Sequence, residues 1–422
     1  MANKLDFLKQ FDQLTALFPV QGNARAVIHN GLDFPTTRDE YWKYTRVTSL
    51  VESRYVRNVP NIDSIDAFRV PGLDAQYLVF VNGEYSERLS DTQLIQGVEV
   101  TSMRLAEGDR KQHMLEHLDR YVDSKTQAFH ALNTSYFIDG SFITVEKNTV
   151  LSDPICILNI SADKQQANNI RNLIVVGEMA KAEFINLHEG YDNAGSLTNA
   201  ITELKVEQGG DASLYMIQND GAESAHINTI QVAQEKDSQS KVVTITQTGK
   251  LVRNNLNFTV SGQGCESNMY GIYFTSDRQH VDNHTYVDHT TPNCNSNELY
   301  KGVMSDRSTG VFNGKIMVRR EAQQTNAFQS NQNILLSDKA TIYTKPELEI
   351  YADDVKCSHG CTIGQLDEEA MFYLQSRGLD KAAAAKLLVQ AFAGDVTAKI
   401  TNDALREKVE GFLHQKFEDQ HA

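Results

Sequence analysis

The sequence lacks the features that mark secreted and membrane proteins. Its five cysteines are an odd number in a chain of 422 residues, whereas disulfide-stapled secreted domains are short and carry an even number. No apolar run approaches the ~20 residues that a membrane-spanning helix needs. The first residues include acidic Asp6 and Asp12, which fit neither a secretory signal nor a transit peptide. We therefore expect a soluble, cytoplasmic protein with reduced cysteines and no contact with a membrane.

An excess of positive charge is also missing. The chain has 55 acidic and 40 basic residues and a formal net charge of −15, which repels a phosphate backbone unless basic side chains gather in one patch. Lysine and arginine are instead spread singly or in pairs, as at Arg319 and Arg320. Nucleic acid is therefore not expected as a partner, while a basic protein partner is compatible with the charge.

The motifs of nucleotide-binding proteins and of common hydrolytic enzymes are absent. The nearest string to a phosphate-binding loop, residues 310–316, has the wrong spacing and no hydroxyl residue after Lys315. Neither a Gly-x-Ser-x-Gly elbow nor a His-Glu-x-x-His zinc motif occurs. We therefore expect a protein that is not an enzyme and that has no nucleotide site of its own.

What is present divides the chain into three zones. The composition, 41% hydrophobic and 23% charged, is that of an ordinary globular protein. Residues 1–130 are expected to form a mixed, mainly helical N-terminal domain, because apolar residues recur at helical spacing between Leu5 and Leu17. Residues 131–365 have the pattern of a β-domain, and residues 366–422 return to a helical pattern.

The central zone predicts a β-solenoid. Short runs rich in Val, Ile, Thr and Tyr recur about every 10 to 15 residues, with polar clusters and no helices between them. The clearest runs are residues 202–206, 213–217, 226–232, 242–247, 255–260, 269–274 and 311–318. Roughly a dozen or more strands are too many for one sandwich, whereas a solenoid stacks them and exposes edges only at its ends. We find no strict short repeat, so the coils must be irregular. An end coil would offer its edge to a partner.

The last zone has clear helix signals. Asp367 can cap a first helix that ends at Gly378. Asp380 opens a second, alanine-rich helix that Gly394 closes, and Asn402 can cap a third. Three short helices bury little surface by themselves, so they either pack on the solenoid or present an apolar face to another protein.

The sharpest group of candidate ligands lies just before these helices. In an extended strand, Cys357, His359 and Cys361 point to one face, with neighbouring Cα atoms ~6–7 Å apart. Thiolate and imidazole select zinc, copper or an iron–sulfur centre over magnesium or calcium. A closed zinc site needs four ligands, and no second Cys or His pair lies nearby in the sequence. Spacing alone leaves two interpretations open, a metal site or buried cysteines beside a turn histidine.

A second group of histidines and aspartates follows one predicted strand. One face of that strand carries His280, Asp282, His284 and Asp288. These residue types suit a carboxylate–histidine metal site or an acid–base pair. A polar ladder along a solenoid wall explains the same pattern, and no nucleophile accompanies it. The role of this group, and of the following His289, stays open at this point.

Five segments of the sequence carry a resemblance to a known family. They are residues 279–285, 300–303, 310–316, 329–337 and 372–378. Together they resemble the SufB/SufD family of iron–sulfur cluster assembly proteins. The segment Cys357-Ser358-His359-Gly360 is similar to the SufD-like members, whereas SufB-like members tend to read Val-Glu-His-Glu-Ala there. Residues 34–36 and 40–45 are similar to the N-terminal signature of the SufD-like members.

The resemblance implies a fold and a set of partners. The family fold is a right-handed parallel β-helix between helical ends, which agrees with the solenoid predicted above. The resemblance implies a complex with SufB and with two copies of the ATPase SufC. In that complex the β-helices of SufB and SufD lie side by side, the C-terminal helices dock on SufC, and a nascent iron–sulfur cluster forms at the SufB–SufD interface. A homodimer of the isolated chain is a further alternative.

The resemblance also implies a role for individual residues. His359 is implied as a ligand of a transient cluster shared with SufB, and Cys357 as its interface neighbour. Cys361 departs from the family, which usually has a small residue there, so its role stays open. The ATPase contact is expected at Phe372, Tyr373, Arg377, Gly378, Leu387, Leu388 and Phe392. The implied function is a non-catalytic scaffold for cluster assembly that is coupled to ATP hydrolysis by SufC.

Two other functions stand as alternatives. A β-helix enzyme acting on polysaccharide would use Asp282, His284 and Asp288 as acid–base residues. A purely structural partner subunit would use Cys357 and His359 for packing alone.

Overall fold

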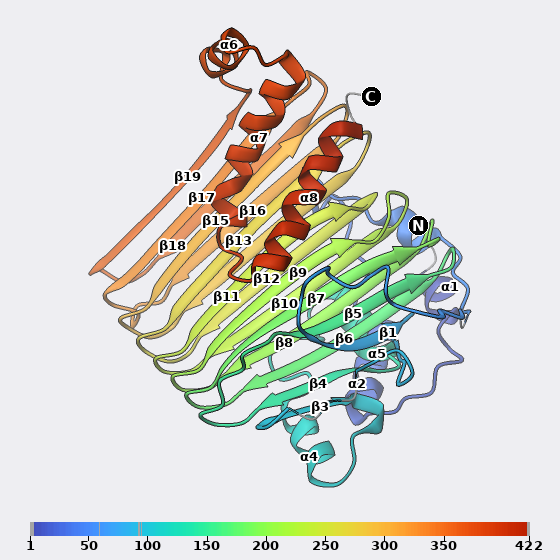
Figure 1. Ribbon diagram of the computed structural model, residues 1–422. Helices are drawn as coiled ribbons and strands as arrows, with labels where there is room; N and C mark the ends of the chain where they lie inside the picture. The colour runs from blue at the N-terminus through green and yellow to red at the C-terminus, as the bar shows by residue number, and fades with distance from the viewer. Residues whose placement is uncertain (1–3, 59, 92, 94, 420–422) are drawn as a thin grey trace.

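Two long sheets face each other and form a solenoid (Figure 1). The computed structural model describes residues 4–58, 60–91, 93 and 95–419. In order across the sheet, the ten-stranded sheet contains β19 Val355–Gly364, β17 Thr325–Leu335, β15 Asn295–Met304, β13 Glu266–Thr275, β11 Gln239–Thr248, β9 Asp211–Asn219, β7 Lys181–Tyr191, β5 Ile155–Ala162, β1 Gln76–Val81 and β2 Glu84–Tyr85. The nine-stranded sheet contains β18 Thr341–Ile350, β16 Thr309–Val318, β14 His280–His289, β12 Leu251–Val260, β10 Ala225–Gln234, β8 Leu197–Val206, β6 Ala167–Val176, β4 Gly140–Val145 and β3 Val98–Ser102.

Successive coils stack in register, each giving one strand to each sheet. Leu251 pairs with His280, His280 with Thr309, and Thr309 with Thr341, so these coils are 29, 29 and 32 residues long. All neighbouring strands are parallel except the terminal pairs β1–β2 and β3–β4. The prediction of a parallel solenoid with irregular coils is therefore confirmed.

Aspartates shape the tight turns between coils. Asp237, Asp277 and Asp306 adopt positive φ angles of 58°, 53° and 54°. Aspartate tolerates this left-handed region better than most residues because its short side chain can form local hydrogen bonds. The sequence clusters of Asp, Asn and Gly between apolar runs therefore mark the corners of the coils.

The space between the sheets is filled partly by apolar side chains and partly by a ladder of amides. The apolar part includes Leu204, Leu214 and Phe258. In the ladder, the Nε2 atom of Gln218 donates to Oδ1 of Asn254 over 2.9 Å, and Nδ2 of Asn254 donates to Oδ1 of Asn283 over 3.0 Å. The first of these bonds joins the two sheets across the interior, and the second joins register neighbours of successive coils. Such bonds satisfy most of the buried amide groups and favour the observed register.

The N-terminal helices cover the outer face of the nine-stranded sheet. Phe129 and Leu132 pack in one cluster with Leu197 and Ile227 of the sheet. The helices are α1 Lys4–Lys9, α2 Pro19–Asn30, α3 Thr48–Glu52, α4 Gly108–His117 and α5 Ala128–Tyr136, with single turns η1 Glu40–Trp42 and η2 Met103–Leu105. The strands β1 and β3 lie in the same part of the chain but join the two sheets. The division of the chain after residues 130 and 365 stays a prediction.

The three C-terminal helices are α6 Glu368–Ser376, α7 Lys381–Thr397 and α8 Asp403–Asp419. Side chains of Asp367, Asp380 and Asn402 accept hydrogen bonds from the first backbone N–H groups of these helices, so the predicted caps are confirmed. The prediction that α7 closes at Gly394 is wrong by one turn. The helix continues because Val396 packs in the same buried cluster as the outer face of the ten-stranded sheet.

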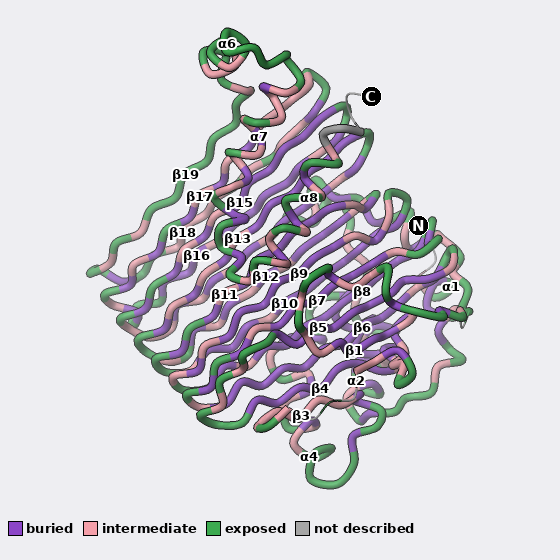
Figure 2. The backbone as a smooth tube through the Cα atoms, in the orientation of Figure 1, coloured by how far each residue is buried: buried purple, intermediate pink, exposed green. Residues whose placement is uncertain are grey.

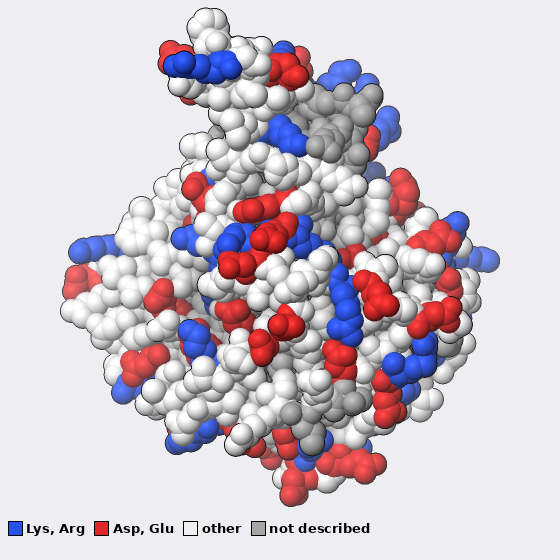
Figure 3. Space-filling view, in the orientation of Figure 1, with Lys and Arg blue, Asp and Glu red and all other residues white. Residues whose placement is uncertain are grey.

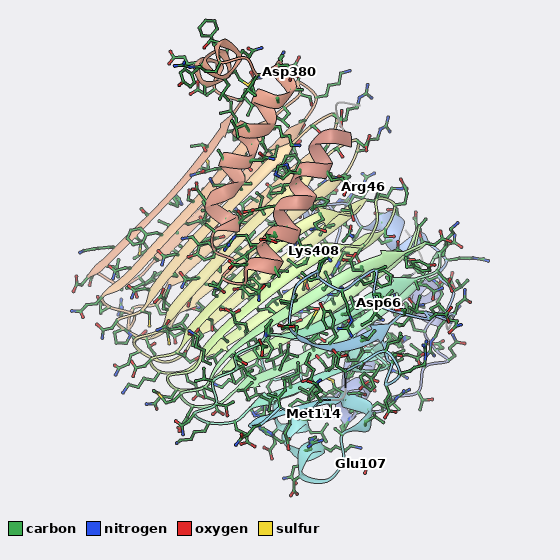
Figure 4. All side chains as sticks on the ribbon, in the orientation of Figure 1. Arg46, Asp66, Glu107, Met114, Asp380 and Lys408 are labelled. Atoms are coloured by element: carbon green, nitrogen blue, oxygen red, sulfur yellow. The ribbon has the colours of Figure 1, made fainter. Side chains whose placement is uncertain are left out.

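These helices differ in how they contact the solenoid. Helices α7 and α8 lie across the ten-stranded sheet, and α6 projects beyond its end (Figure 1). Figure 4 labels Asp380 near the start of α7 and Lys408 on α8. The Nζ atom of Lys408 lies 3.2 Å from a carboxylate oxygen of Glu189 on the sheet. No buried residue occurs in α6, so this helix is free to contact another molecule.

On the face shown in Figure 3, acidic and basic side chains are interspersed and form no single basic field. Among the described residues, no helix is both long and apolar enough to cross a membrane.

Candidate functional site

Strand β19 forms the last edge of the ten-stranded sheet, and β18 forms the last edge of the other sheet. In the described part of the chain, no further strand pairs with either of them. Figure 2 shows β19 as largely exposed. Large apolar side chains also reach solvent at this end, with Phe328 45%, Tyr343 41% and Ile363 50% exposed. We call the exposed coil formed by β18 and β19 the open end, and its free strand edges can extend into the sheet of another protein.

The three candidate ligands on β19 lie in one row at the open end. Cys357 and His359 are in register with Ala327 and Gln329 of β17, whose side chains are buried inside the solenoid. Cys361 follows two residues further along the same strand. Because side chains alternate across a strand, the row faces the same side as the interior of the preceding coil. The structure therefore brings together the three residues that the spacing placed on one face.

Their environments differ along the strand. Cys357 packs beside Ala327 and Leu348 and is half-buried, whereas His359 and Cys361 are exposed. Burial raises the pKa of the Cys357 thiol above its usual value, which keeps the free thiol protonated until a metal or a cationic partner stabilises the thiolate. All five cysteines of the chain are free thiols.

A row of buried polar side chains continues from His359 into the solenoid. Gln329 is the register neighbour of His359, and its Nε2 atom donates to Oε2 of Glu298 over 2.8 Å. Thr285 of the opposite sheet donates to Oε1 of Glu298 over 2.5 Å. Burial raises the pKa of Glu298 to about 7, although both hydrogen bonds favour the carboxylate. The buried Oε1 atom of Gln329 has no hydrogen-bond partner. The row of polar side chains therefore ends, next to His359, in an acceptor atom that is available for a hydrogen bond.

Sequence reasoning missed Glu298 and gave no role to Gln329. The signal that identifies them is the coil period, because Glu298 pairs with Gln329 and Gln329 with His359 at intervals of 31 and 30 residues. The coil length varies along the chain, so this pairing follows from the strand register in the structure and not from the sequence alone.

The second predicted group binds the N-terminal segment to the solenoid wall. The Nη1 atom of Arg253 donates to Oδ2 of Asp282 over 2.6 Å, and the hydroxyl of Thr45 donates to the same oxygen. The Thr45 hydroxyl also lies 2.9 Å from Nε2 of His280. Nε2 of His284 lies 3.1 Å from Oδ1 of Asp282. These contacts join Thr45, more than two hundred residues away in sequence, to a buried ion pair.

The ion pairs of this group do not favour the acid–base role considered for it. Asp282 is 1% exposed, and although burial opposes its charge, Arg253 holds its pKa well below the usual range. A general acid would need a raised pKa instead. Asp288 is occupied by a two-point contact with Arg319, at 2.8 and 3.0 Å. The next histidine, His289, faces the interior and lies 2.9 Å from the hydroxyl of Ser296.

The residues expected at an ATPase contact fall into two groups. Those exposed to solvent are Phe372, Tyr373, Arg377, Gly378 and Leu387. Phe372 is 75% exposed, more than any other exposed large apolar residue among the described ones. Leu388 and Phe392 are half-buried. Phe392 packs against the outer face of the ten-stranded sheet, with Nζ of Lys301 4.4 Å from its ring centroid. The exposed group is therefore concentrated on α6 and the first half of α7.

Comparison with known proteins gives the chain its family. Residues 158–392 match the family described as SUF system FeS cluster assembly, SufBD core domain, and residues 22–157 match the SufBD protein N-terminal region. The chain is 31% identical over 397 residues to an iron–sulfur cluster assembly SufBD family protein of Synechocystis, covering 90% of this chain and 86% of the relative. It is 28% identical over 402 residues to the iron–sulfur cluster assembly protein SufD of Escherichia coli, covering 94% and 92%.

A plant relative matches about two thirds of the chain. The chain is 31% identical over 298 residues to the chloroplastic protein ABCI7 of Arabidopsis thaliana, covering 68% of this chain and 63% of the relative. The core match alone spans more than half of the 422 residues. The parallel solenoid with helices at both ends, the matched core and N-terminal regions, and the full-length similarity to SufD agree with one another. The chain therefore belongs to the SufBD family of iron–sulfur cluster assembly proteins and is a homologue of SufD.

Proposed function

We propose that this protein is the SufD-type scaffold subunit of a cytoplasmic complex with a SufB-type solenoid and a SufC-type ATPase. In this complex it binds a transient iron–sulfur cluster between its open end and the SufB-type partner. His359 supplies a ligand and Cys357 is its neighbour at the interface, while Cys361 is positioned to add a third. The observation that carries the proposal is the row of thiol and imidazole side chains on the free edge strand β19.

The chemistry of the row fits an iron–sulfur cargo. Cysteine thiolates and histidine nitrogens are the protein groups that hold such clusters. Three residues from one chain leave part of the coordination to the partner, so the cluster can form only when the two solenoids meet. One N–H of the His359 ring can donate to the unpartnered Oε1 of Gln329, its register neighbour. Such a hydrogen bond would orient the imidazole and leave the other nitrogen free for iron.

The ATPase partner is assigned to the C-terminal helices. Exposed aromatic residues gather on α6, where Phe372 and Tyr373 lie beside Arg377, whose guanidinium is 5.3 Å from the Tyr373 ring centroid. Aromatic and arginine side chains are the usual anchors of protein interfaces. ATP-driven closure of the ATPase pulls on residues 367–393, moves the open end relative to the SufB-type partner and opens the interface between them, so that iron and sulfide reach His359 and Cys357. Hydrolysis resets the scaffold.

Anaerobic reconstitution tests the ligand role. The purified chain is mixed with iron and sulfide, with and without a SufB-type partner, and cluster formation is followed by visible absorption. His359→Ala is expected to lose most of the cluster formed in the presence of the partner. Ser358→Ala is the matched control, because Ser358 lies on the same strand and points to the opposite face. Normal cluster formation by His359→Ala would remove the ligand role, and an unchanged spectrum for the wild type with partner would favour a purely structural subunit.

A further inference from the structure

Two histidines and an aspartate meet inside the solenoid, far along the chain from the open end. His188 lies on β7, His226 lies on β10, and Asp220 follows the last residue of β9. Their neighbours Leu187 and Ile227 pack in the clusters on the outer faces of the two sheets. Because side chains alternate across a strand, His188 and His226 therefore point inward from opposite sheets. All three residues are no more than 1% exposed.

The three side chains have the spacing of metal ligands. Each offers one ligand atom, and these atoms all lie within 4.8 Å of one another. The two imidazole rings are 4.7 Å apart between centroids and are inclined by 61°. Donor atoms ~2 Å from a shared ion lie ~3–4 Å from one another. Small rotations of the side chains would therefore bring the two imidazole nitrogens to coordination distance of one ion.

The hydrogen bonds around Asp220 prepare His226 to act as a ligand. Nδ1 of His226 lies 2.6 Å from Oδ2 of Asp220, and the hydroxyl of Thr198 donates to Oδ1 over 3.0 Å. A carboxylate beside Nδ1 favours the tautomer that carries its proton there, which leaves the Nε2 lone pair free. Carboxylate–histidine pairs of this kind are the usual support of metal-binding imidazoles.

Two buried nitrogen atoms have no partner within the protein. Nε2 of His188 and Nε2 of His226 are both inaccessible to solvent, and neither forms a hydrogen bond with the described residues. Buried polar atoms are nearly always satisfied, so two such atoms in adjacent rings indicate a group that lies between them. No lysine or arginine forms an ion pair with Asp220 in the described chain.

We propose that His188 and His226 bind one divalent transition-metal ion inside the solenoid through their free Nε2 atoms, and that Asp220 holds His226 in the tautomer that this requires. Imidazole nitrogen suits zinc, iron and other first-row transition metals, whereas calcium and magnesium prefer oxygen ligands alone. The ion joins β7 of one sheet to β10 of the other. It is a resident ion of the solenoid interior, separate from any cargo at His359, and the proposal does not depend on cluster assembly.

Cobalt provides the test because it reports its own coordination. The full chain is produced in zinc-depleted medium supplemented with Co²⁺, since ligands this deeply buried are filled during folding. Metal content is measured against protein concentration, and the visible spectrum is recorded. We expect one Co²⁺ per chain with the absorption of a nitrogen- and oxygen-ligated ion. The Co²⁺-loaded chain is also expected to melt about 3 °C above the metal-free chain at a hundredfold excess of metal over Kd.

Four variants decide the outcome. His188→Gln and His226→Gln should each lose the bound Co²⁺, its spectrum and the shift in melting temperature. His359→Ala and His130→Gln should keep them, because His359 lies on β19 and the buried His130 instead bonds Thr229. Circular dichroism confirms that each variant is folded. A wild-type chain without stoichiometric Co²⁺, or equal Co²⁺ in all four variants, would overturn the proposal. Neither result would alter the reconstitution test at His359.

Discussion

Replacing Glu298 by glutamine should remove a defined part of the pH dependence of stability. Glu298 is 4% exposed, and burial raises its pKa from 4.5 to about 7 in the folded chain. The folded state therefore binds a proton that the unfolded state has lost between these two pH values. The stabilising contribution is complete below pH ~4.5 and is lost as the pH rises through ~7. Between pH 5.5 and pH 8.0, the loss amounts to about 2 kcal/mol of the free energy of unfolding.

The glutamine side chain is neutral throughout, so it should keep its stability over the same range. The substitution fits the local hydrogen bonds. Thr285 can continue to donate to the amide oxygen, and a rotation of the Gln329 amide would bring its unpartnered Oε1 atom to accept from the new NH₂ group. Because the desolvated charge is removed, Glu298→Gln should be more stable than the wild type at pH 8.0 by up to about 3 kcal/mol.

Urea unfolding of both proteins at closely spaced pH values from 5.5 to 8.0 provides the measurement. Other groups titrate in this range, and subtracting the curve of Glu298→Gln from that of the wild type isolates Glu298. The difference should fall by about 2 kcal/mol, most steeply below pH ~6.5, and should level off above pH ~7. Parallel curves for the two proteins would refute the reasoning, because Glu298 would then have nearly the same pKa in the folded and unfolded chains.

Three further substitutions test the packing and the partner surface. Asp282→Ala leaves the Arg253 guanidinium buried without its carboxylate and should lower the free energy of unfolding in urea by about 3–5 kcal/mol. An effect below about 1 kcal/mol would mean that the pair is solvated. Gly271→Ala places a methyl group against the buried ring of Tyr300 and should cost about 1–3 kcal/mol in the same assay, so wild-type stability would show that the ring can move. Phe372→Ala should change stability by no more than about 0.5 kcal/mol yet reduce co-purification with a SufC-type ATPase. Full retention of the ATPase would exclude this side chain from the contact.

The architecture was predictable because its signals are local. Alternating apolar runs predicted the strands, the absence of helices between them predicted a solenoid, and capping residues such as Asp367 located the helix starts. The end of α7 was predicted less well, since Gly394 is a strong stop signal in sequence. The burial of Val396 against the sheet outweighs that signal. Tertiary packing commonly overrides a single unfavourable residue in this way.

The sites were predictable only where their residues share one strand. Alternation placed Cys357, His359 and Cys361 on one face, and the register confirms this. The group around Asp282 was ambiguous because its partners, Arg253 and Thr45, come from another coil and from the N-terminal segment. Contacts of this kind depend on coil lengths, which vary by several residues where the turns differ. No local pattern reports them.

The two ends of the solenoid differ in the strand edge that they offer to another molecule. At the first coil the sheets finish in β2 and β3, strands of two and five residues that run antiparallel to their neighbours. At the last coil, β18 and β19 are each ten residues long. A molecule with one edge that can pair binds one other molecule and no more, because the pairing occupies that edge. Stacked parallel strands usually carry the hazard of fibre growth. Here the first coil offers only short antiparallel edge strands, which would oppose growth from that end and leave strand pairing to the open end.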